Sequence, residues 1–354
     1  MSEQNKRKVL MIGAGGMAKI WIRYFLPSFS DRLEIIALVD IIPEVLAEQA
    51  EFLNLPHHCR FATIHDAFNA VRRGQIEPDV CIVVVPPHFH KEAVEQAAAL
   101  NIDVLSEKPI ADTWVACVET YQAIKKSNIK MQVIQNYRYT PWITQAKRVL
   151  AESELGQINY IVARFAEDYR ARNSWGAPFR HQIPHALLIE GGVHHLDQIR
   201  HLTGDDFLSI SGADWRPTFS SESFDGECCA LFIGRMRSGA VAVYEGSCIS
   251  AGEINSWNDE LYRIELERGT IIIRKDTITR ILNHESEVIQ VQHALLEWDG
   301  HYQAINAFLE WLDGSPPPLG NIEDNIKTAA TVFAAIQASE EHLVVKIDNY
   351  LRKL

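Results

Sequence analysis

The 354-residue chain is predicted to be an α/β protein with two domains. A doubly wound parallel sheet is expected over residues 1–135, and an α+β domain with a large, mostly antiparallel open sheet over residues 136–354. Three observations predict this. An apolar run near the N-terminus ends in a glycine-rich turn; strand-like and helix-like segments then alternate; extended segments joined by short polar turns follow. The length exceeds what one hydrophobic core normally organises, so two domains are expected.

The first predicted element is a strand that ends at Ile12 and leads through a tight turn into a helix. Gly13, Gly15 and the small residue Ala18 fit the dinucleotide-binding pattern. In that pattern the first position allows the turn, the second lets the backbone approach a pyrophosphate, and the third packs the helix on the strand. The pyrophosphate would lie at the helix N-terminus, where N–H groups can bind it. Because glycines also serve ordinary turns, the loop alone leaves both explanations open.

A second apolar run, residues 33–39, ends in Asp40. An acid about 20 residues beyond such a loop can bind the ribose hydroxyls, although it could also cap the next helix. Loop and acid together predict a Rossmann unit. The carboxylate would repel a 2′-phosphate, and no Lys or Arg occurs in residues 41–44, so NAD is predicted in preference to NADP.

The alternation continues up to residue 135. Residues 79–85 form a continuous apolar run of the kind found in buried parallel strands. Short connections between strands and helices of this kind predict right-handed crossovers and a parallel sheet. The predicted helices are 43–53, 91–100 and 113–127, and the later strands are 102–105 and 131–135.

Extended segments dominate from about residue 158. Short polar turns such as residues 237–239 imply hairpins, and hence a mostly antiparallel sheet. The predicted strands are 158–169, 207–215, 227–236, 240–248, 262–274 and 277–282. Helices are expected over 187–202, 302–312 and 323–342.

Composition excludes several classes of function. The net charge of −12 argues against nucleic acid and anionic membrane surfaces, because both attract clustered Lys and Arg. The polar N-terminus and the early glycines argue against a signal or membrane span, so a cytoplasmic protein is expected. Six cysteines lack C-x-x-C spacing and are expected to be buried free thiols.

Two clusters of residues could carry chemistry. The first is Glu107-Lys108-Pro109, which follows a predicted strand at the edge where doubly wound sheets bind ligands. A lysine there can hydrogen-bond a substrate hydroxyl and stabilise a developing alkoxide, with Pro109 stiffening the turn. The alternative for any isolated lysine is a solvated surface position, but the location of Lys108 favours the functional interpretation.

The second cluster is a polar stripe on the helix predicted over 187–202. The residues at helical spacing are Glu190, His194, Asp197 and His201. Two glycines early in this helix suggest close approach by a ligand or another backbone. The stripe could be a solvated face, or it could bind zinc through Glu190 and His194. It could also be an acid/base group in which His194 takes a hydroxyl proton and Asp197 or Glu190 orients it. The third interpretation is favoured, because a nicotinamide site lacks only a proton acceptor; no metal is therefore expected.

With these motifs, and with residues 84–90 (VVPPHFH) and 136–139 (NYRY), the chain resembles the Gfo/Idh/MocA family of NAD(P)-dependent oxidoreductases. The resemblance implies that Lys108 and His194 flank the substrate carbon. Where many relatives have aspartate four residues before the histidine, this chain has Glu190, and a loop that often reads Thr-Pro-Asn is Pro86-Pro87-His88. The cofactor contacts expected from the loop and the resemblance are Gly13, Gly15, Gly16, Met17, Ala18, Asp40, Pro86, His90, Glu107 and Asn136.

The expected activity is hydride transfer between NAD and a CH–OH carbon of a sugar, cyclitol or related polyol. Lys108 and His194 would be catalytic, with Glu190 assisting. A protein that senses NAD(H) without turnover is the main alternative, and a metal-dependent hydrolase is the third. A homodimer or homotetramer is expected by resemblance, because an open sheet face commonly packs against another subunit. The expected substrate contacts are Arg164, Tyr169, Trp175, His185 and Asp197.

Overall fold

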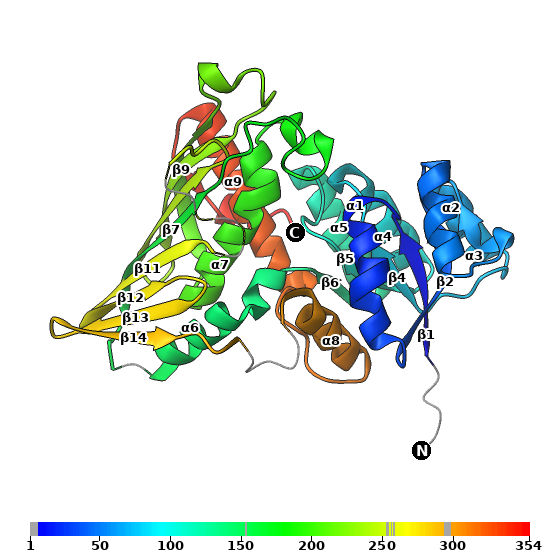
Figure 1. Cartoon of the computed structure of the whole chain (residues 1–354), viewed down its shortest axis with the longest axis horizontal. Coiled ribbons are helices and arrows are strands. Elements are labelled where there is room, and N and C mark those ends of the chain that lie inside the picture. The colour runs from blue at the N-terminus through cyan, green and yellow to red at the C-terminus, as the bar shows by residue number, and fades with distance from the viewer. Residues whose placement is uncertain (1–5, 153, 253–254, 256, 258, 294–298) are drawn as a thin grey trace. The chain divides into compact units, whose positions relative to one another are not determined.

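The computed structural model describes residues 6–152, 154–252, 255, 257, 259–293 and 299–354 (Figure 1). The chain divides into two compact units. The first contains the residues up to Ile134 together with Ile305–Ile326, and the second contains Gln135–Ala304 together with Lys327–Leu354.

The first unit is built on a six-stranded sheet in which every pair of neighbours is parallel. The strand order is β3-β2-β1-β4-β5-β6, so the chain reverses its direction of winding between β1 and β4. This confirms the predicted doubly wound sheet, and it marks the edge beyond β1 and β4 as the ligand-binding switch point. The strands are β1 (Arg7–Ile12), β2 (Leu33–Val39), β3 (Arg60–Phe61), β4 (Val80–Val83), β5 (Asp103–Ser106) and β6 (Met131–Val133).

Helices join these strands, and the three whose bounds were predicted agree within one residue at each end. Thr63 and Thr113 cap α3 and α5 by accepting hydrogen bonds from first-turn N–H groups, which satisfies donors that the helix itself leaves open. The first helix continues into one π-helical turn (Trp21–Phe25) and a 3₁₀ turn (Leu26–Phe29). The helices are α1 (Gly16–Ile20), α2 (Pro43–Phe52), α3 (Ile64–Arg72), α4 (His90–Ala99) and α5 (Trp114–Ser127).

A late segment of the chain completes the first unit, which differs from the predicted division at residue 135. Asp313, just after α8 (Gly300–Leu312), forms ion pairs of 2.6 Å with both Arg7 and Arg32. The Val133 N–H donates to the Gly320 carbonyl at 2.9 Å, beside the end of β6. These contacts join positions far apart in sequence, so local patterns could not assign the segment to the first unit.

The second unit contains a nine-stranded sheet of order β14-β13-β12-β11-β7-β10-β9-β8-β15. Among the paired strands only β7 and β10 are parallel, which confirms a mostly antiparallel sheet. The strands are β7 (Ile158–Ala166), β8 (Phe207–Trp215), β9 (Cys229–Met236), β10 (Val241–Ser247), β11 (Leu261–Leu266), β12 (Gly269–Ile273), β13 (Thr277–Leu282), β14 (Glu285–Gln290) and β15 (Val345–Lys346).

The sequence missed some elements of this unit. The single strand predicted over 262–274 is a hairpin, because Glu267 and Arg268 form a tight turn between β11 and β12. Strand β14 was not predicted, since nearly every residue in it is exposed and gives no apolar alternation. Helix α6 (Pro141–Glu152) was also missed, whereas α9 (Ile322–Glu341) agrees with prediction.

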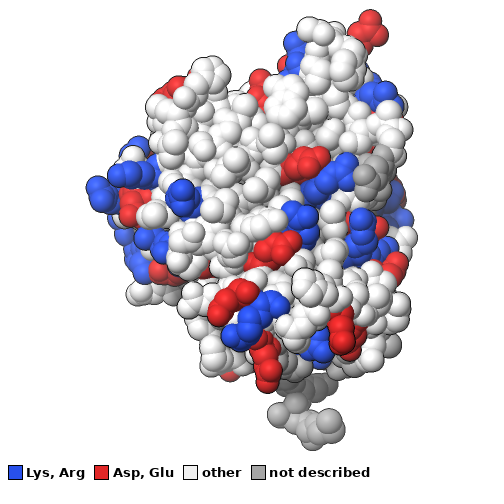
Figure 2. Space-filling model, turned by 90° about the vertical axis from the view of Figure 1, so that its left-hand side faces the viewer, with Lys and Arg blue, Asp and Glu red and all other residues white. Residues whose placement is uncertain are grey.

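The two faces of the large sheet differ. Ile161, Ala163 and Phe165 of β7 are buried on the face against which α7 (Val193–Thr203) packs, seen as the green helix beside β7 in Figure 1. On the opposite face Leu231 and Ile233 of β9 are 48% and 54% exposed. Figure 2 views the side on which these strands lie and shows wide areas without charged residues. This face is a partly apolar surface with no covering element among the described residues.

The helix predicted over 187–202 begins with a π-helical turn, Leu188–Gly192, and continues as α7. A Cβ added to Gly191 would lie 3.0 Å from the Trp257 ring, and one added to Gly192 would lie 3.2 Å from Leu188 Cδ2. The two glycines therefore admit neighbouring side chains at close range. The sequence suggested a ligand or another backbone; the shortest of these protein contacts are with side chains, and the approach of a ligand stays a prediction.

Two further expectations concern the whole chain. All six cysteines are free and buried, as predicted. No helix of the described residues has the length and apolar character needed to cross a membrane.

Candidate active site

The glycine loop after β1 has the backbone geometry that the dinucleotide pattern requires. Gly13 adopts a φ of +101°, and a Cβ there would lie 2.0 Å from the Val84 carbonyl oxygen of the neighbouring β4 segment. Gly16, with φ +38°, has nothing within 4 Å of its Cβ position, and Gly15 meets only Val45 at 3.8 Å. Within α1, Ala18 is fully buried, whereas Met17 is partly exposed. The loop thus packs closely against Val84 at Gly13 and is open at Gly16, which fits a cradle for phosphates.

Asp40 lies beside this loop at the end of β2. Its Oδ2 accepts a hydrogen bond from Ala14 N–H at 2.8 Å, and its Oδ1 accepts one from Ile42 N–H at 2.9 Å. Helix α2 has no side-chain cap, so the alternative role of Asp40 as a cap is wrong. A carboxylate has about four acceptor positions, and each oxygen can therefore accept a further bond from a ribose hydroxyl.

His90 supports the turn that carries Lys108. Its ring is fully buried, with Nδ1 2.8 Å from the Pro109 carbonyl oxygen and Nε2 2.8 Å from the Val85 carbonyl oxygen. The Lys108–Pro109 peptide bond is cis. His90 therefore joins the loop after β4 to the turn after β5, while Pro86 remains partly exposed.

Glu107 and Lys108 follow β5 directly. Trp21 Nε1–H donates to Glu107 Oε1 at 2.9 Å, and the Glu107 side chain is buried. Lys108 is partly exposed at the same edge of the sheet as the glycine loop. The structure thus anchors the backbone on both sides of Lys108 and leaves part of its side chain open to solvent.

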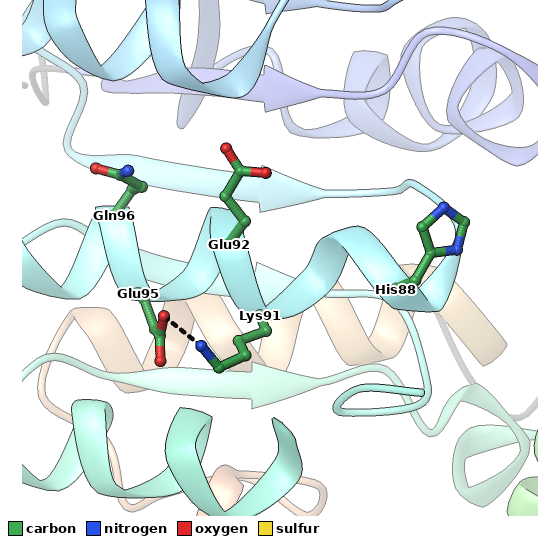
Figure 3. Close-up of a pocket in the computed structure, with 5 residues that line it drawn as sticks. All are labelled: His88, Lys91, Glu92, Glu95 and Gln96. Carbon is green, nitrogen blue, oxygen red and sulfur yellow. Dashed lines mark hydrogen bonds and ion pairs between the residues drawn. The ribbon is translucent and has the colours of Figure 1, made fainter. Parts of the chain in front are cut away.

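A shallow depression on the first unit lies beside this edge (Figure 3). It is lined by one helix and the turn before it, and Lys91 pairs across it with Glu95 at 2.9 Å. It contains no residue of the glycine loop, so it is not the phosphate cradle. The lining residues are His88, Lys91, Glu92, Glu95 and Gln96.

Three of the four residues of the polar stripe are buried, which overturns its interpretation as a solvated face, and His201 is partly exposed. Glu190, His194 and Asp197 are all less than 7% exposed. Glu190 Oε2 accepts from Arg180 Nε at 2.8 Å. The His194 ring stacks on Tyr137, with centroids 4.3 Å apart and planes 11° from parallel. Glu190 and His194 therefore have different neighbours, and Asn136 lies partly exposed next to Tyr137.

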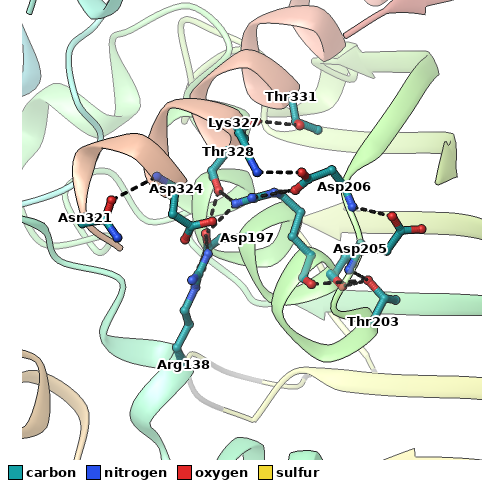
Figure 4. A network of polar contacts seen from close by, with 12 residues as sticks. Arg138, Asp197, Thr203, Asp205, Asp206, Asn321, Asp324, Lys327, Thr328 and Thr331 are labelled. Carbon is teal, nitrogen blue, oxygen red and sulfur yellow. Dashed lines mark hydrogen bonds and ion pairs between the residues drawn. The ribbon is translucent and has the colours of Figure 1, made fainter. Parts of the chain in front are cut away.

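Asp197 belongs to a network of buried charges (Figure 4). Its two carboxylate oxygens accept from Arg138 Nε and Nη2, both at 2.6 Å, and Oδ1 also accepts from Thr328 Oγ1 at 2.6 Å. Arg200 donates to Thr328 and to Asp206, which extends the network across α7. Asp197 is thus held by Arg138 and Thr328. It does not make the contacts with His194 that an orienting role would need.

An aromatic cluster adjoins His194. Tyr169 stacks on Trp175 with centroids 5.4 Å apart and planes 5° from parallel, and Trp257 lies 6.0 Å from Trp175 and 6.5 Å from His194. Burial raises the pKa of Tyr137 and of Tyr169, so both remain neutral hydroxyl groups at ordinary pH. Sequence reasoning missed Trp257 because its sequence neighbours carry no motif, and it used Tyr137 only as part of a family pattern.

Two predicted substrate residues lie elsewhere. Arg164 alternates with the buried Phe165 on β7, so its side chain lies on the opposite face of the sheet from α7, where it pairs with Glu245 at 3.0 Å. This position does not support its assignment as a substrate contact. His185 is 2.7 Å from Asp214 of β8, and strands β9 and β10 separate β8 from the β7 end that precedes Tyr169.

His185 has an acidic environment. Burial alone would lower its pKa, but the hydrogen bond and negative charge of Asp214, together with Glu227 and Glu340, outweigh burial and raise the pKa. Among the described residues, the side chains arranged to bind a metal ion are His185, Asp214 and Glu227. That group contains neither Glu190 nor His194, so the zinc site considered for the stripe has no support in the structure.

Two stretches of the chain match known families. Residues 7–135 match "Oxidoreductase family, NAD-binding Rossmann fold", and residues 143–272 match "GFO/IDH/MocA C-terminal domain". The protein y4oX of Sinorhizobium fredii is 34% identical over 98% of this chain and 97% of its own length. D-apiose dehydrogenase of Paraburkholderia graminis is 23% identical over 90% of this chain and 84% of its own.

The fold also matches solved structures. A crystal structure of an oxidoreductase from Agrobacterium radiobacter, in complex with NAD⁺, L-tartaric acid and magnesium, has a TM-score of 0.84 at 19% identity. The match covers 98% of this chain and 99% of that one. The two family matches span most of the chain, and the match to y4oX spans nearly all of it. The chain therefore belongs to the Gfo/Idh/MocA family of oxidoreductases, whose N-terminal domain is an NAD-binding Rossmann fold.

Proposed function

We propose that the protein is a dehydrogenase that transfers a hydride between NAD and a CH–OH carbon of a sugar, cyclitol or related polyol. One observation carries the proposal. Lys108 directly follows β5 at the sheet edge that also bears the glycine loop, and Glu107 and His90 hold the backbone around it. Its similarity to D-apiose dehydrogenase supports a sugar-like substrate.

NAD is the proposed cofactor. The glycine loop would hold its pyrophosphate, and Asp40 would accept hydrogen bonds from the ribose hydroxyls. Ile41 and Ile42 next to Asp40 are exposed and apolar, and residues 41–44 contain no Lys or Arg that could bind a 2′-phosphate. Met17, Pro86 and Asn136 are proposed as further contacts, since each is partly exposed. His90 is proposed to act indirectly, because its buried ring binds two backbone carbonyls.

Bound NAD would supply the hydride acceptor. His194 is proposed to take the hydroxyl proton, and Lys108 to donate a hydrogen bond to the same oxygen as its negative charge develops. The flat stack of Tyr137 on His194 would fix the orientation of the imidazole. Glu190 is proposed to act through Arg180, whose guanidinium it binds and which also donates to the Trp175 carbonyl oxygen at 3.2 Å.

The aromatic cluster is proposed as part of the substrate-binding surface. Tyr169 and Trp257 are partly exposed, whereas Trp175 is buried behind them. The C–H faces of a sugar or cyclitol are apolar enough to pack on aromatic rings, while its hydroxyls need polar partners. Both requirements are available where His194 and Arg180 adjoin these rings.

A substrate panel tests the proposed function. Purified protein would be incubated with NAD and a set of sugars, cyclitols and sugar acids while the absorbance of NADH is followed. We expect NADH to form with at least one member of the panel. NAD binding without turnover on every member would favour the alternative, a protein that senses NAD(H).

Replacing Asp40 tests the cofactor assignment. We expect Asp40→Ser to lower NAD affinity and to weaken the preference for NAD over NADP by about tenfold or more, because the carboxylate that repels the 2′-phosphate is removed. Isothermal titration with both cofactors measures the preference. Glu44→Ser is the matched control, since it removes an acid from the first turn of α2 without touching the loop. An unchanged ratio of the two affinities in Asp40→Ser would contradict the ribose-binding role.

A homodimer or homotetramer is proposed from the open face of the large sheet. Leu231 and Ile233 are about half exposed there, and Figure 2 shows few charges over wide parts of this side. Faces of this kind commonly pack against a second subunit. Light scattering would measure the mass in solution, and a monomer at micromolar concentration would contradict the proposal.

A further inference from the structure

A second cluster of ionisable groups lies in the second unit and plays no part in the proposed reaction. It brings together His185, which precedes the π-helical turn, Asp214 near the end of β8, and Glu227, which precedes β9. One ligand atom from each lies within 4.8 Å of the other two. Glu340 of α9 approaches from the other side of the imidazole.

Carboxylates lie near both ring nitrogens of His185. Nδ1 lies 2.7 Å from Asp214 Oδ2 and 3.7 Å from Glu227 Oε2, whereas Nε2 lies 3.4 Å from Glu340 Oε1. Two ligand atoms of a tetrahedral zinc ion are separated by roughly 3.3 Å, which falls between the two distances at Nδ1. The ligand atoms of Asp214 and Glu227 lie within 4.8 Å of each other, so an ion at Nδ1 would need the two carboxylates to close around it.

The charges of the cluster are not balanced by protein cations. Three carboxylates surround one imidazole, and no described Lys or Arg pairs with Asp214, Glu227 or Glu340. The nearest basic residue in sequence, Arg216, instead donates to the carbonyl oxygens of Phe224 and Asp225. Even a protonated imidazole would leave an excess of negative charge, which favours a divalent cation.

Asp214 provides a separate indication of a missing ligand. Its side chain is 1% exposed, yet its Oδ1 accepts no hydrogen bond from any residue that the structure describes. A buried carboxylate oxygen without a partner is costly, and such groups usually bind a donor or a metal ion. The remaining oxygen, Oδ2, is the one that contacts His185.

We infer that His185 Nδ1, Asp214 and Glu227 bind one zinc ion. Imidazole nitrogen and carboxylate oxygen are both zinc ligands, and three protein ligands leave one position for water. Glu340 would accept the Nε2–H of His185, as carboxylates do for many metal-bound histidines. The ion would tie the segment before α7 to β8 and to the start of β9, and thereby hold the chain that leads to Glu190 and His194. The site contains none of the proposed catalytic groups, so this inference does not rest on the proposed function.

Zinc binding to the full-length protein tests this inference. Protein without a polyhistidine tag would be treated with EDTA, desalted, incubated with excess ZnCl₂ and desalted again. Elemental analysis then gives the zinc content, and competition with a chromogenic chelator gives the affinity. We expect one zinc ion per chain, and a thermal unfolding midpoint that rises with zinc.

Variants of two ligands, Asp214 and Glu227, and of Glu340, which would accept a hydrogen bond from the third, locate the ion. Asp214→Asn and Glu227→Gln should each lower zinc affinity at least about tenfold, and Glu340→Gln should lower it by a similar or smaller factor. His293→Ala is the matched control, because His293 and Asp276 form an exposed pair 3.1 Å apart. Circular dichroism would establish that each variant folds. Glu227 is less buried than Asp214, so Glu227→Gln decides the outcome if Asp214→Asn does not fold.

Two results would overturn the inference. One is that the wild type retains no zinc after desalting, which would leave His185 as an ion-pair partner of the carboxylates only. The other is that Asp214→Asn and Glu227→Gln bind zinc as tightly as the wild type and the His293→Ala control. Neither result would change the interpretation of the substrate panel, because His185, Asp214 and Glu227 are not among the proposed catalytic groups.

Discussion

Lys108→Met is expected to lower turnover at least about a hundredfold while leaving NAD affinity nearly unchanged. The substitution keeps an apolar stem of similar length but removes the positive charge that would stabilise the alkoxide. Glu107 and His90 hold the surrounding backbone through contacts that do not involve the Lys108 ammonium, so the turn should persist. Steady-state rates with the substrate found in the panel, and calorimetry with NAD, measure the two quantities separately.

The matched control is Lys91→Met. Lys91 belongs to α4 in the same unit and pairs with Glu95 and Glu119 on the surface, so its loss should change turnover by less than about twofold. A Lys108→Met enzyme with wild-type turnover would contradict the catalytic assignment. A large loss of NAD affinity in that variant would instead indicate that Lys108 acts in cofactor binding.

Much of the fold could be predicted because its signals are local. Residues 9–16 alone predict the turn at Gly13. A continuous apolar run is enough to identify β4 as a buried parallel strand. Strand β8 was predicted with its observed bounds, since polar turns flank it. Strand β14 lacked any such signal, because an exposed edge strand of polar residues shows no alternation.

The candidate site was less predictable because its partners are distant in sequence. Helical spacing placed Glu190, His194 and Asp197 on one stripe, but it could not reveal that Asp197 meets Arg138, 59 positions away. Likewise, His185 meets Asp214 over 29 positions, and no motif marks the pair. The first contact joins the helical turn at residues 136–139 to α7, and the second joins the segment before α7 to β8. Both depend on tertiary packing, which a single sequence does not determine.

One error could have been avoided from the sequence. Arg164 and Phe165 are adjacent on a predicted strand, and adjacent strand residues point to opposite faces. If Phe165 faces the covering helices, then Arg164 must face away from them. The alternation rule was therefore sufficient to place Arg164 and Phe165 on opposite faces once β7 was assigned.

Asp197→Ala is expected to lower the free energy of unfolding of the second unit by about 3–5 kcal/mol. The reason is that Arg138 would remain buried without its carboxylate, and an uncompensated charge in the interior is costly. Thr328 would lose an acceptor as well. Urea unfolding followed by tryptophan fluorescence measures the change, since Trp175 and Trp257 both lie in this unit.

Two further variants separate burial from contact with substrate. Asp168→Ala is the matched control, because Asp168 also binds an arginine through both carboxylate oxygens but is about one-third exposed, so its loss should cost at most about 1 kcal/mol. The double variant Arg138→Met/Asp197→Leu should recover much of the lost stability, since it removes both buried charges. If Asp197 instead contacts substrate, Asp197→Ala would unfold like the wild type and show a raised KM, and the double variant would not restore that KM.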